Sequence, residues 1–578
     1  MEQNTRLPIK IVEPHASDFR QPQGGGGRRK QFGAVTDKVR KRHAEQLDKV
    51  AAHFAGWFKE APSIPAVARV VLKRDALAKS YRPTKLFSDE TCPIMGGGRF
   101  GELFVGVTRS RLRKLRERIL TGTSMVDKAN ISTIQQIEPF TAQDAVGVEG
   151  IDGLANVLEG KGHRLKLRLF VHASAVENAR LVKRLLKLTQ GLGLPQPDEL
   201  RYGQGSCVLR LTGVTPDHVA ALAGFAGTRS LATFPAFTVV KTASIPVGSV
   251  TALTFPEPDP AADYPIIGVV DTGTDPRDPV LAPWVAAREI YVPDVDADFD
   301  HGSFVSGLAV YAQVLNDDRF PGHPVKVLDV RAVPKSGAIL EDDLLAILEE
   351  VIPKYPAVRV WNLSLNTTEV SDDVFSDLAM ALDALMDEHG VTIACSAGNY
   401  KRIPFRGWPP EDLGEDDRIK SPADAVRAIA VGSLAHLDRP GSRVRREDPS
   451  PFTRRGPGAA FLPKPELVHY GGNCKPDGDF TQIGVRSLNG KGNIAEDIGT
   501  SFSAPLVANV LANIDGAIQG PVSPCLLRAL AIHSAALGNP DLTAVELRYK
   551  GFGVPGELAG IVTCAPWEAT LIFEPELV

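Results

Sequence analysis

Three residues that could together perform nucleophilic catalysis lie in separate short motifs: Asp271, His301 and Ser501. A serine hydroxyl is a weak nucleophile until a histidine accepts its proton, and that histidine needs an acid to hold it in the right tautomer. Asp271 directly follows the apolar run Ile266–Val270, which indicates a buried strand. Functional residues of open α/β sheets lie at the C-terminal ends of such strands. The three side chains therefore predict acyl transfer at one edge of a sheet.

The sequence around these residues narrows the chemistry further. Their chain order is acid, histidine, serine, which is the order of the subtilisin-type triad. Asp271 is followed by Thr-Gly-Thr, His301 by Gly-Ser-Phe-Val-Ser-Gly, and Ser501 stands in Gly-Thr-Ser-Phe-Ser-Ala-Pro. With these motifs the chain resembles the subtilisin-like serine peptidases over about residues 265–535. Aspartic peptidases share the Asp-Thr-Gly tripeptide, but their bilobal form needs two copies and this chain has one.

The resemblance implies further site residues. The Asn399 side-chain amide and the Ser501 backbone N–H would bind the oxyanion of the tetrahedral intermediate. A substrate pocket would lie between two strand ends, with Ser364 and Leu365 in one wall and Ser396, Ala397 and Gly398 in the other. The chemistry requires no metal ion and no cofactor. The implied activity is that of a serine endopeptidase acting on proteins or peptides through an acyl-enzyme.

The sequence departs from the family pattern in three places. Asn366 stands where the family often has glycine, on the backbone that would receive the substrate strand. Phe304 replaces a commonly polar position after the histidine, a change that we expect to be tolerated. Between Tyr400 and Asp497, two polar stretches rich in Gly and Pro, residues 401–420 and 471–493, predict surface loops near the groove that would influence substrate selection.

The fold expected for the peptidase part, residues 265–578, is a doubly wound α/β domain with a subtilisin-like parallel sheet. Short apolar runs alternate with helical segments: Ile266–Val270, Val327–Val330, Val358–Trp361, Val391–Cys395 and Ala428–Val431. Runs that are short and continuously apolar suit parallel strands buried on both faces. Their alternation with helices is typical of an α/β domain.

The sequence before residue 265 predicts a separate extension. We expect residues 1–60 to form a flexible arm, up to about residue 35, and then a helix from Thr36 to Phe58. Residues 61–245 alternate strand and helix and predict two small α+β modules of the ferredoxin-like type, the second closed by a strand at Phe237–Val240. Residues 246–264, which carry several prolines, are expected to be a linker.

The extension suggests a regulatory role. Pro-regions of the subtilisin-like family are small α+β modules whose C-terminal tail lies along the active-site groove, and residues 160–245 have a compatible pattern. The extension would then repress the peptidase or receive an activating signal. The competing interpretation is a permanently attached adaptor that recruits a partner. Resemblance to extended bacterial subtilases, some of which are paired with an AAA-type ATPase in stress or phage defence, suggests such an ATPase as a partner.

Two charged segments have alternative interpretations. Asp294, Asp296, Asp298 and Asp300 alternate before the histidine and could hold a calcium ion, but a solvated acidic loop is the favoured interpretation. The basic run within residues 109–118 could contact nucleic acid or an acidic partner, but the wet face of an amphipathic helix is favoured.

Composition excludes several classes of protein. The formal net charge of -4 is too small to favour nucleic acid or a membrane as a partner. The first residues lack the apolar core of a secretory signal, and no run of 18 apolar residues predicts a membrane span. The six cysteines lack CxxC spacing and are expected to be reduced thiols, so we expect a cytoplasmic protein. The alternative function is a binding or scaffold module whose peptidase site is dispensable.

Overall fold

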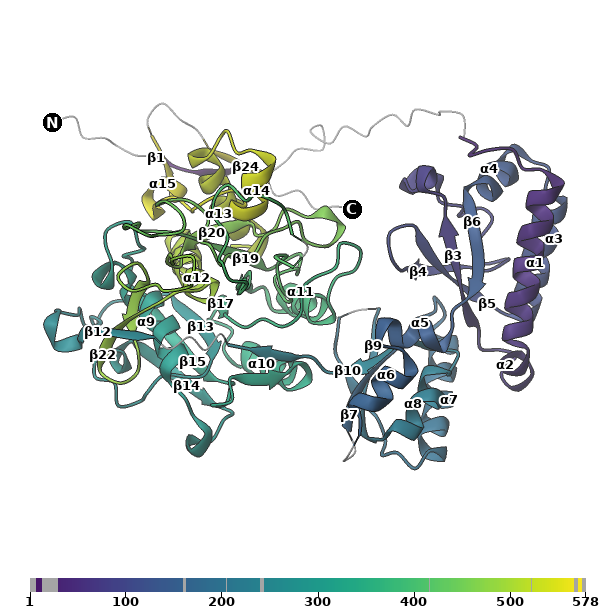
Figure 1. The fold of residues 1–578 in the computed structure, drawn as a ribbon, viewed down its shortest axis with the longest axis horizontal. Helices are drawn as coiled ribbons and strands as arrows, with labels where there is room; N and C mark the ends of the chain where they lie inside the picture. Colours follow the sequence, from purple (N-terminus) through teal and green to yellow (C-terminus); the bar gives the residue numbers. More distant parts are fainter. Residues whose placement is uncertain are drawn as a thin grey trace. The chain divides into compact units, whose positions relative to one another are not determined.

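The computed structural model describes residues 7–12, 30–159, 163–203, 205–239, 244–414, 416–520, 522–565 and 570–573. The chain divides into two compact units (Figure 1). Unit 1 comprises residues 1–20 and 235–578, and unit 2 comprises residues 21–234. In the sequence, unit 2 is therefore inserted between two segments of unit 1.

Unit 1 is built on a seven-stranded sheet in the order β14-β15-β13-β17-β18-β19-β20, in which every pair of neighbours is parallel. The strands are β13 (Ile266–Asp271), β14 (Val285–Ile290), β15 (Lys326–Arg331), β17 (Val360–Leu363), β18 (Thr392–Ser396), β19 (Ile429–Leu434) and β20 (Leu467–Tyr470). The expected α/β class and the five predicted strands are confirmed. The two edge strands were not predicted, because β14 is only half-buried and β20 is interrupted by the polar His469.

Helices cover this sheet and complete the core of unit 1. They are α9 (Asp300–Leu315), α10 (Glu341–Lys354), α11 (Asp377–His389), α12 (Thr500–Ala517), α13 (Pro524–Gly538), α14 (Ala544–Lys550) and α15 (Leu558–Val562). α12 is central: it packs on α9 and on β17, β18, β19 and β20 (Figure 1). Apolar residues of α9, α12 and α13 join the strands in one core cluster. The helices that carry the histidine and serine motifs are thus fixed to the same sheet.

Short strands around unit 1 correct three expectations. Residues 7–12, expected in a flexible arm, form β1 (Leu7–Pro8) and β2 (Lys10–Val12), which pair with β23 (Thr563–Cys564) and β24 (Leu571–Phe573). The expected linker overlaps β12 (Ile245–Ser249), which joins β22 (Asn493–Asp497) and β21 (Val485–Leu488) in one sheet. β11 (Ala236–Thr238) does not close the second module; it pairs with β16 (Ala338–Leu340). Strand patterns in the sequence do not reveal which edge a strand joins.

Unit 2 contains the two predicted α+β modules, each with a four-stranded antiparallel sheet (Figure 1). Module 1 comprises α1 (Asp37–His53), α2 (Ala55–Glu60), β3 (Ala66–Leu72), β4 (Ile94–Gly97), β5 (Glu102–Val107), α3 (Arg109–Thr121), α4 (Met125–Thr133) and β6 (Ile134–Pro139). Module 2 comprises α5 (Ala142–Val146), α6 (Gly150–Val157), β7 (His163–Leu169), α7 (Ala175–Gly191), β8 (Asp198–Leu200), β9 (Cys207–Val214), α8 (Pro216–Ala223) and β10 (Thr228–Thr233).

The two modules differ in how closely they follow the ferredoxin-like pattern. From β7 to β10 the order is β-α-β-β-α-β, which is that pattern. In module 1, short 3-10 turns at Arg74–Ala76 and Lys79–Tyr81 stand where the first crossover helix would be. The preceding helix α1 instead packs on α3 and β6. Module 1 therefore takes its second helix from before its first strand.

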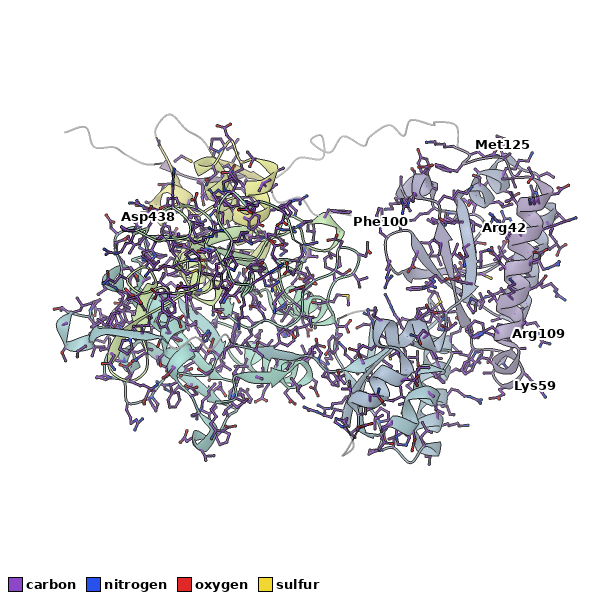
Figure 2. All side chains as sticks on the ribbon, in the orientation of Figure 1. Arg42, Lys59, Phe100, Arg109, Met125 and Asp438 are labelled. Atoms are coloured by element: carbon purple, nitrogen blue, oxygen red, sulfur yellow. The ribbon has the colours of Figure 1, made fainter. Side chains whose placement is uncertain are left out.

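On α1 and α3, the lysine and arginine residues other than the buried Arg40 are exposed or half-buried. Leu112, Leu115 and Ile119 form the buried face of α3, whereas Arg109 is exposed, as is Arg42 on α1 (Figure 2). This agrees with the favoured interpretation of the basic run. Among the described residues, every helix is too short or too polar to cross a membrane. All six cysteines are free thiols.

Candidate active site

Asp271 and His301 are bonded to each other in the interior of unit 1. The Asp271 carboxylate accepts a hydrogen bond at Oδ1 from His301 Nδ1 over 2.7 Å. The Asp271 side chain is 1% exposed and the His301 side chain 9%. Thr272 also donates its backbone N–H to the same carboxylate oxygen, over 2.7 Å. The contact fixes the imidazole with a proton on Nδ1, which leaves Nε2 as the nitrogen able to accept a proton.

The two residues meet because β13 and α9 approach closely. Asp271 ends β13, and its carbonyl accepts the N–H groups of Ala332 and Val333 beyond the neighbouring strand. His301 lies in the first turn of α9, where Gly302 donates its N–H to Thr272 Oγ1 over 2.9 Å. A Cβ on Gly302 would lie 2.2 Å from the carbonyl oxygen of Gly273. Only glycine allows this approach, so the His-Gly pair of the motif has a steric reason.

Ser501 is the second residue of α12 and is 2% exposed. Its backbone carbonyl accepts a hydrogen bond from Ser364 Oγ over 2.9 Å, and its own Oγ donates to the Ser364 carbonyl over 3.4 Å. His301 Nε2 has no hydrogen-bond partner among the described residues. The serine–histidine hydrogen bond is thus not formed in this state. In unliganded enzymes such bonds are often long and shorten only when substrate binds.

Asn399 is held by the residue that precedes the serine. Its Oδ1 accepts hydrogen bonds from the Thr500 backbone N–H over 2.9 Å and from Thr500 Oγ1 over 3.0 Å. Thr500 Oγ1 in turn accepts the N–H of Gly398 over 3.1 Å. Two donors on the oxygen identify it, so the amide N–H₂ is the end left to donate to another acceptor. Thr500 was not predicted to support the site, although its position next to Ser501 was a usable signal.

The two expected pocket walls are bridged by a side chain. Ser364 and Leu365 follow β17, while Ser396 ends β18 and leads into Ala397 and Gly398. The walls are adjacent because β17 and β18 are paired. Asn366 Nδ2 donates to the Ser396 carbonyl over 2.7 Å, and Ser396 Oγ donates to Asn366 Oδ1 over 3.1 Å. Asn366, which stands where the family often has glycine, therefore links the two pocket walls through these side-chain hydrogen bonds.

Carboxylates control the charge of His301. Burial alone lowers the pKa of His301, but the charge and hydrogen bond of Asp271, together with the more distant Asp497 and Asp298, raise it above its ordinary value. Phe502 closes one side of the imidazole, with ring centroids 5.7 Å apart, and itself packs on Phe304 at 4.4 Å. Phe304 is accordingly buried as part of the site's support. The arrangement suits an imidazole that takes up a proton during a reaction.

The family comparison decides the class of this unit. The model of the subtilase family, peptidase S8, matches residues 263–553, which is half of the chain. The chain belongs to the subtilase family. Membership supports a serine peptidase, and the matched range contains every candidate site residue described above.

Other similar proteins add little to the family model. A protein of Sinorhizobium fredii (strain NBRC 101917 / NGR234), "Uncharacterized protein y4bN", is 35% identical to this subtilase over 208 residues. That match covers 30% of this chain and only 46% of the relative. A cold-adapted subtilisin-like serine proteinase is 20% identical with a TM-score of 0.34, covering 48% of this chain and 85% of its own. The S41 psychrophilic protease is 22% identical with a TM-score of 0.38, and the match covers 50% of this chain and 90% of that protease.

The acidic residues before His301 form ion pairs with several different basic side chains. Asp294 pairs with Arg331 over 2.8 Å, Asp296 lies 3.8 Å from Lys335, and Asp300 pairs with Lys491 over 2.5 Å. Within the described ranges, no three His, Cys, Asp or Glu side chains gather as metal ligands would. Three of these four carboxylates are thus paired with basic side chains.

The Asn399 amide can be tested by truncation. We expect Asn399→Ala to lower kcat by about 100- to 1,000-fold with little change in KM, because the amide acts only when charge develops on the carbonyl oxygen. Steady-state kinetics on a short peptide measure both constants. Asn489→Ala, which removes another buried amide of unit 1 that bonds Lys491 N–H, is the matched control. A large rise in KM with kcat intact would contradict the assignment.

Proposed function

We propose that this subtilase is a serine endopeptidase that uses Asp271, His301 and Ser501. The observation that carries the proposal is the buried 2.7 Å bond between Asp271 and His301, at the sheet edge from which α12 presents Ser501. A buried carboxylate beside an imidazole stabilises the charged imidazolium form. This pairing is useful when the imidazole gains a proton during turnover. A scaffold would have no use for this arrangement.

The residues act in the following order. Ser501 Oγ attacks the peptide carbonyl carbon while its proton passes to His301 Nε2, and Asp271 stays ionised against Nδ1–H. The carbonyl oxygen becomes an oxyanion that accepts hydrogen bonds from the Asn399 amide and the Ser501 N–H. His301 then protonates the leaving amine, and the C–N bond breaks. Water, activated by the same imidazole, releases the acid product from Ser501.

An assay on the full chain separates this function from a scaffold. Casein hydrolysis that is blocked by a fluorophosphonate, with covalent labelling of Ser501, is the expected result. A folded protein that neither hydrolyses casein nor reacts with the fluorophosphonate, even when it carries Phe237→Ala, would favour the scaffold.

We further propose that residues 236–239, a short tail that follows unit 2 in the sequence, repress the peptidase by lying in its substrate groove. The strand β11 is bonded on both edges. Along one edge, Phe237 faces Ile339 in the antiparallel pair with β16, and Val239 N–H reaches the Gly337 carbonyl over 3.0 Å. Along the other edge, the Thr238 N–H donates to the Asn366 carbonyl over 2.9 Å, and the Thr238 carbonyl accepts the Asn366 N–H over 3.3 Å. An extended peptide held between two backbones is the way a substrate strand binds.

The direction of this segment supports repression. It runs antiparallel to the wall Ser364–Asn366, so from Thr238 onward it heads toward Ser364, whose hydroxyl bonds Ser501. The Phe237 side chain is 0% exposed and Val239 is 5% exposed. A fully buried phenylalanine contributes on the order of 3–5 kcal/mol. A competing substrate would have to displace both the backbone hydrogen bonds of β11 and the buried Phe237 side chain.

Weakening the tail should therefore raise activity. We expect Phe237→Ala to increase kcat/KM on a short peptide by about tenfold or more, because a loss of 1.4 kcal/mol in tail binding is a factor of about 10. The rate of fluorophosphonate labelling should rise in parallel. Val247→Ala, which trims a half-exposed side chain of β12, should leave both rates unchanged. Equal rates in Phe237→Ala and wild type would instead support an adaptor.

A further inference from the structure

The two walls of the expected substrate pocket diverge where two strands stop pairing. β17 and β18 are paired as far as Leu363 and Cys395. Beyond this pair, Asn366 bonds Thr238 of β11, whereas Ala397 stays bonded to β19 through its N–H. Because the two walls follow different neighbours, a gap opens between them.

This gap begins beside the proposed nucleophile. Ser364, the first residue of one wall, bonds the Ser501 carbonyl over 2.9 Å. Asn399, whose amide would bind the oxyanion, directly follows the other wall. A substrate carbonyl that lies between Ser501 and Asn399 has the side chain of its own residue at the mouth of the gap. That residue, which precedes the cleaved bond, is the cleavage-site residue.

The side chain of Asn366 crosses the gap. Its Nδ2 donates to the Ser396 carbonyl over 2.7 Å, and its Oδ1 accepts the Ser396 hydroxyl over 3.1 Å. Both ends of the amide are thus bonded to the opposite wall. Asn366 is 6% exposed and Ser396 is 0% exposed. A large substrate side chain could enter only by breaking two buried hydrogen bonds, which is costly when the groups are left unpaired.

The opposite wall, residues 396–398, can neither fill the gap nor move away from it. Its side chains are small or absent. A Cβ on Gly398 would lie 3.0 Å from Arg454 Cδ and 3.2 Å from Lys420 Cβ, so these two side chains are packed against the wall. The width of the gap is therefore set by the side chain at residue 366.

Asn366 is also fixed at its backbone. Its carbonyl and its N–H both bond Thr238 of the tail. A substrate strand that replaced the tail would make the same two backbone bonds. The Asn366 side chain would therefore keep its position when a substrate binds.

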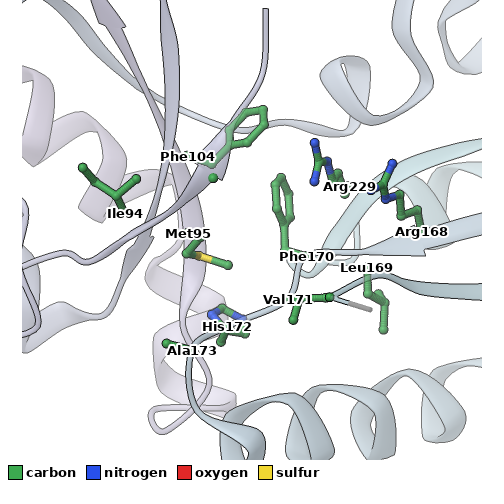
Figure 3. Close-up of a pocket in the computed structure, with 12 residues that line it drawn as sticks. Ile94, Met95, Phe104, Arg168, Leu169, Phe170, Val171, His172, Ala173 and Arg229 are labelled. Carbon is green, nitrogen blue, oxygen red and sulfur yellow. The ribbon is translucent and has the colours of Figure 1, made fainter. Parts of the chain in front are cut away.

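A separate hollow in the chain does not belong to this groove. A cavity of about 270 Å³ in unit 2 is lined by Met95, Phe104 and Phe170, among others (Figure 3). Its described lining residues all belong to unit 2, whereas Ser501 and both pocket walls belong to unit 1. Selection of the cleavage-site residue therefore depends on the gap.

We propose that Asn366 restricts the cleavage-site residue to glycine, alanine or serine, so that the peptidase cuts proteins after small residues. This inference rests on the proposed peptidase function and names its substrate class. Asn366 determines specificity and takes no part in the bond-making steps. Replacing it by alanine or glycine opens the gap to leucine and phenylalanine.

Two peptides in one reaction test the selection. They are identical except for alanine or phenylalanine as the cleavage-site residue, and mass spectrometry follows both products. Since both peptides compete for the same free groove, the ratio of their kcat/KM values does not depend on how much of it the tail occupies. We expect the wild type to prefer the alanine peptide by about tenfold or more. In Asn366→Ala and Asn366→Gly, the phenylalanine peptide should gain about tenfold or more relative to the alanine peptide.

The matched control removes another buried amide of unit 1. Asn513 on α12 donates its Nδ2 to the Asn509 carbonyl over 2.9 Å, and Asn513→Ala should keep the wild-type ratio. Equal cleavage of the two peptides by the wild type, or an unchanged ratio in both Asn366 variants, would overturn the inference and leave the peptidase standing. If neither peptide is cut and no fluorophosphonate label is found, in wild type and in Phe237→Ala alike, the peptidase and this role of Asn366 are both disproved.

Discussion

Replacing Ser501 by alanine is expected to lower kcat by about a million-fold and to abolish labelling by a fluorophosphonate. In the proposed mechanism Ser501 Oγ becomes acylated, and no neighbouring group can supply the same bond. Ser501 packs in the first turn of α12 through its backbone carbonyl, which Ser364 binds, and alanine keeps that contact. The variant should therefore fold. Steady-state hydrolysis of a short peptide and mass spectrometry of the labelled chain measure the two effects.

The control for this experiment lies two residues along the same helix. Ser503 is fully buried and donates its hydroxyl to the His469 carbonyl over 3.0 Å, away from His301. Ser503→Ala should lose some stability but keep labelling at Ser501. Hydrolysis at the wild-type rate by Ser501→Ala, or a label attached to another residue, would disprove the nucleophile.

The second large effect is expected from Asp271→Asn, which should lower kcat by about 10,000-fold. An asparagine of the same shape can donate to Nδ1 and so favours the tautomer with the proton on Nε2, which cannot accept the proton of Ser501. The substitution also removes the charge that most raises the pKa of His301. Hydrolysis rates measured between pH 5 and 9 report both effects.

The direction of the pH effect follows from the role of the base. In the proposed mechanism the base is neutral His301, so in the wild type the rate should fall as pH drops through a value above the ordinary histidine pKa of about 6.5. In Asp271→Asn the residual activity should persist to lower pH. Asp278→Asn, in which the altered carboxylate bonds the N–H groups of Val280 and Leu281, is the matched control and should keep the wild-type profile. An unchanged profile in Asp271→Asn would contradict the pairing.

The sequence predicted the five inner strands of the sheet of unit 1 well because they are buried on both faces. A run such as Ala428–Val431 is apolar at every position, which is the pattern of a parallel strand buried on both faces. The strand β11 illustrates the limit. Its residues indicate a strand, but whether it joins the sheet of module 2 or pairs with β16 depends on contacts with residues about 100 positions away.

In the candidate site, too, the sequence predicted the residues but not all of the contacts between them. The residue types and motif neighbours predicted Asp271, His301 and Ser501, and the structure brings the first two into contact. Asn366 could be recognised as a departure from glycine, yet its two hydrogen bonds to Ser396 depend on the pairing of β17 with β18. Such side-chain contacts between neighbouring strands carry no signal in a single sequence.

The inserted position of unit 2 determines what a single cut could achieve. Strands β1 and β2 belong to unit 1, and the chain returns to unit 1 at Pro235. Cleavage just after Val239 would produce an N-terminal fragment that still binds the rest of the protein at two places, through these strands and through β11. Such a fragment is a bivalent ligand: when one attachment opens, the other keeps it at high effective concentration, and rebinding is favoured. If β11 represses the peptidase as proposed, nicking alone would free the groove only briefly, and lasting activation would require both attachments to be lost together.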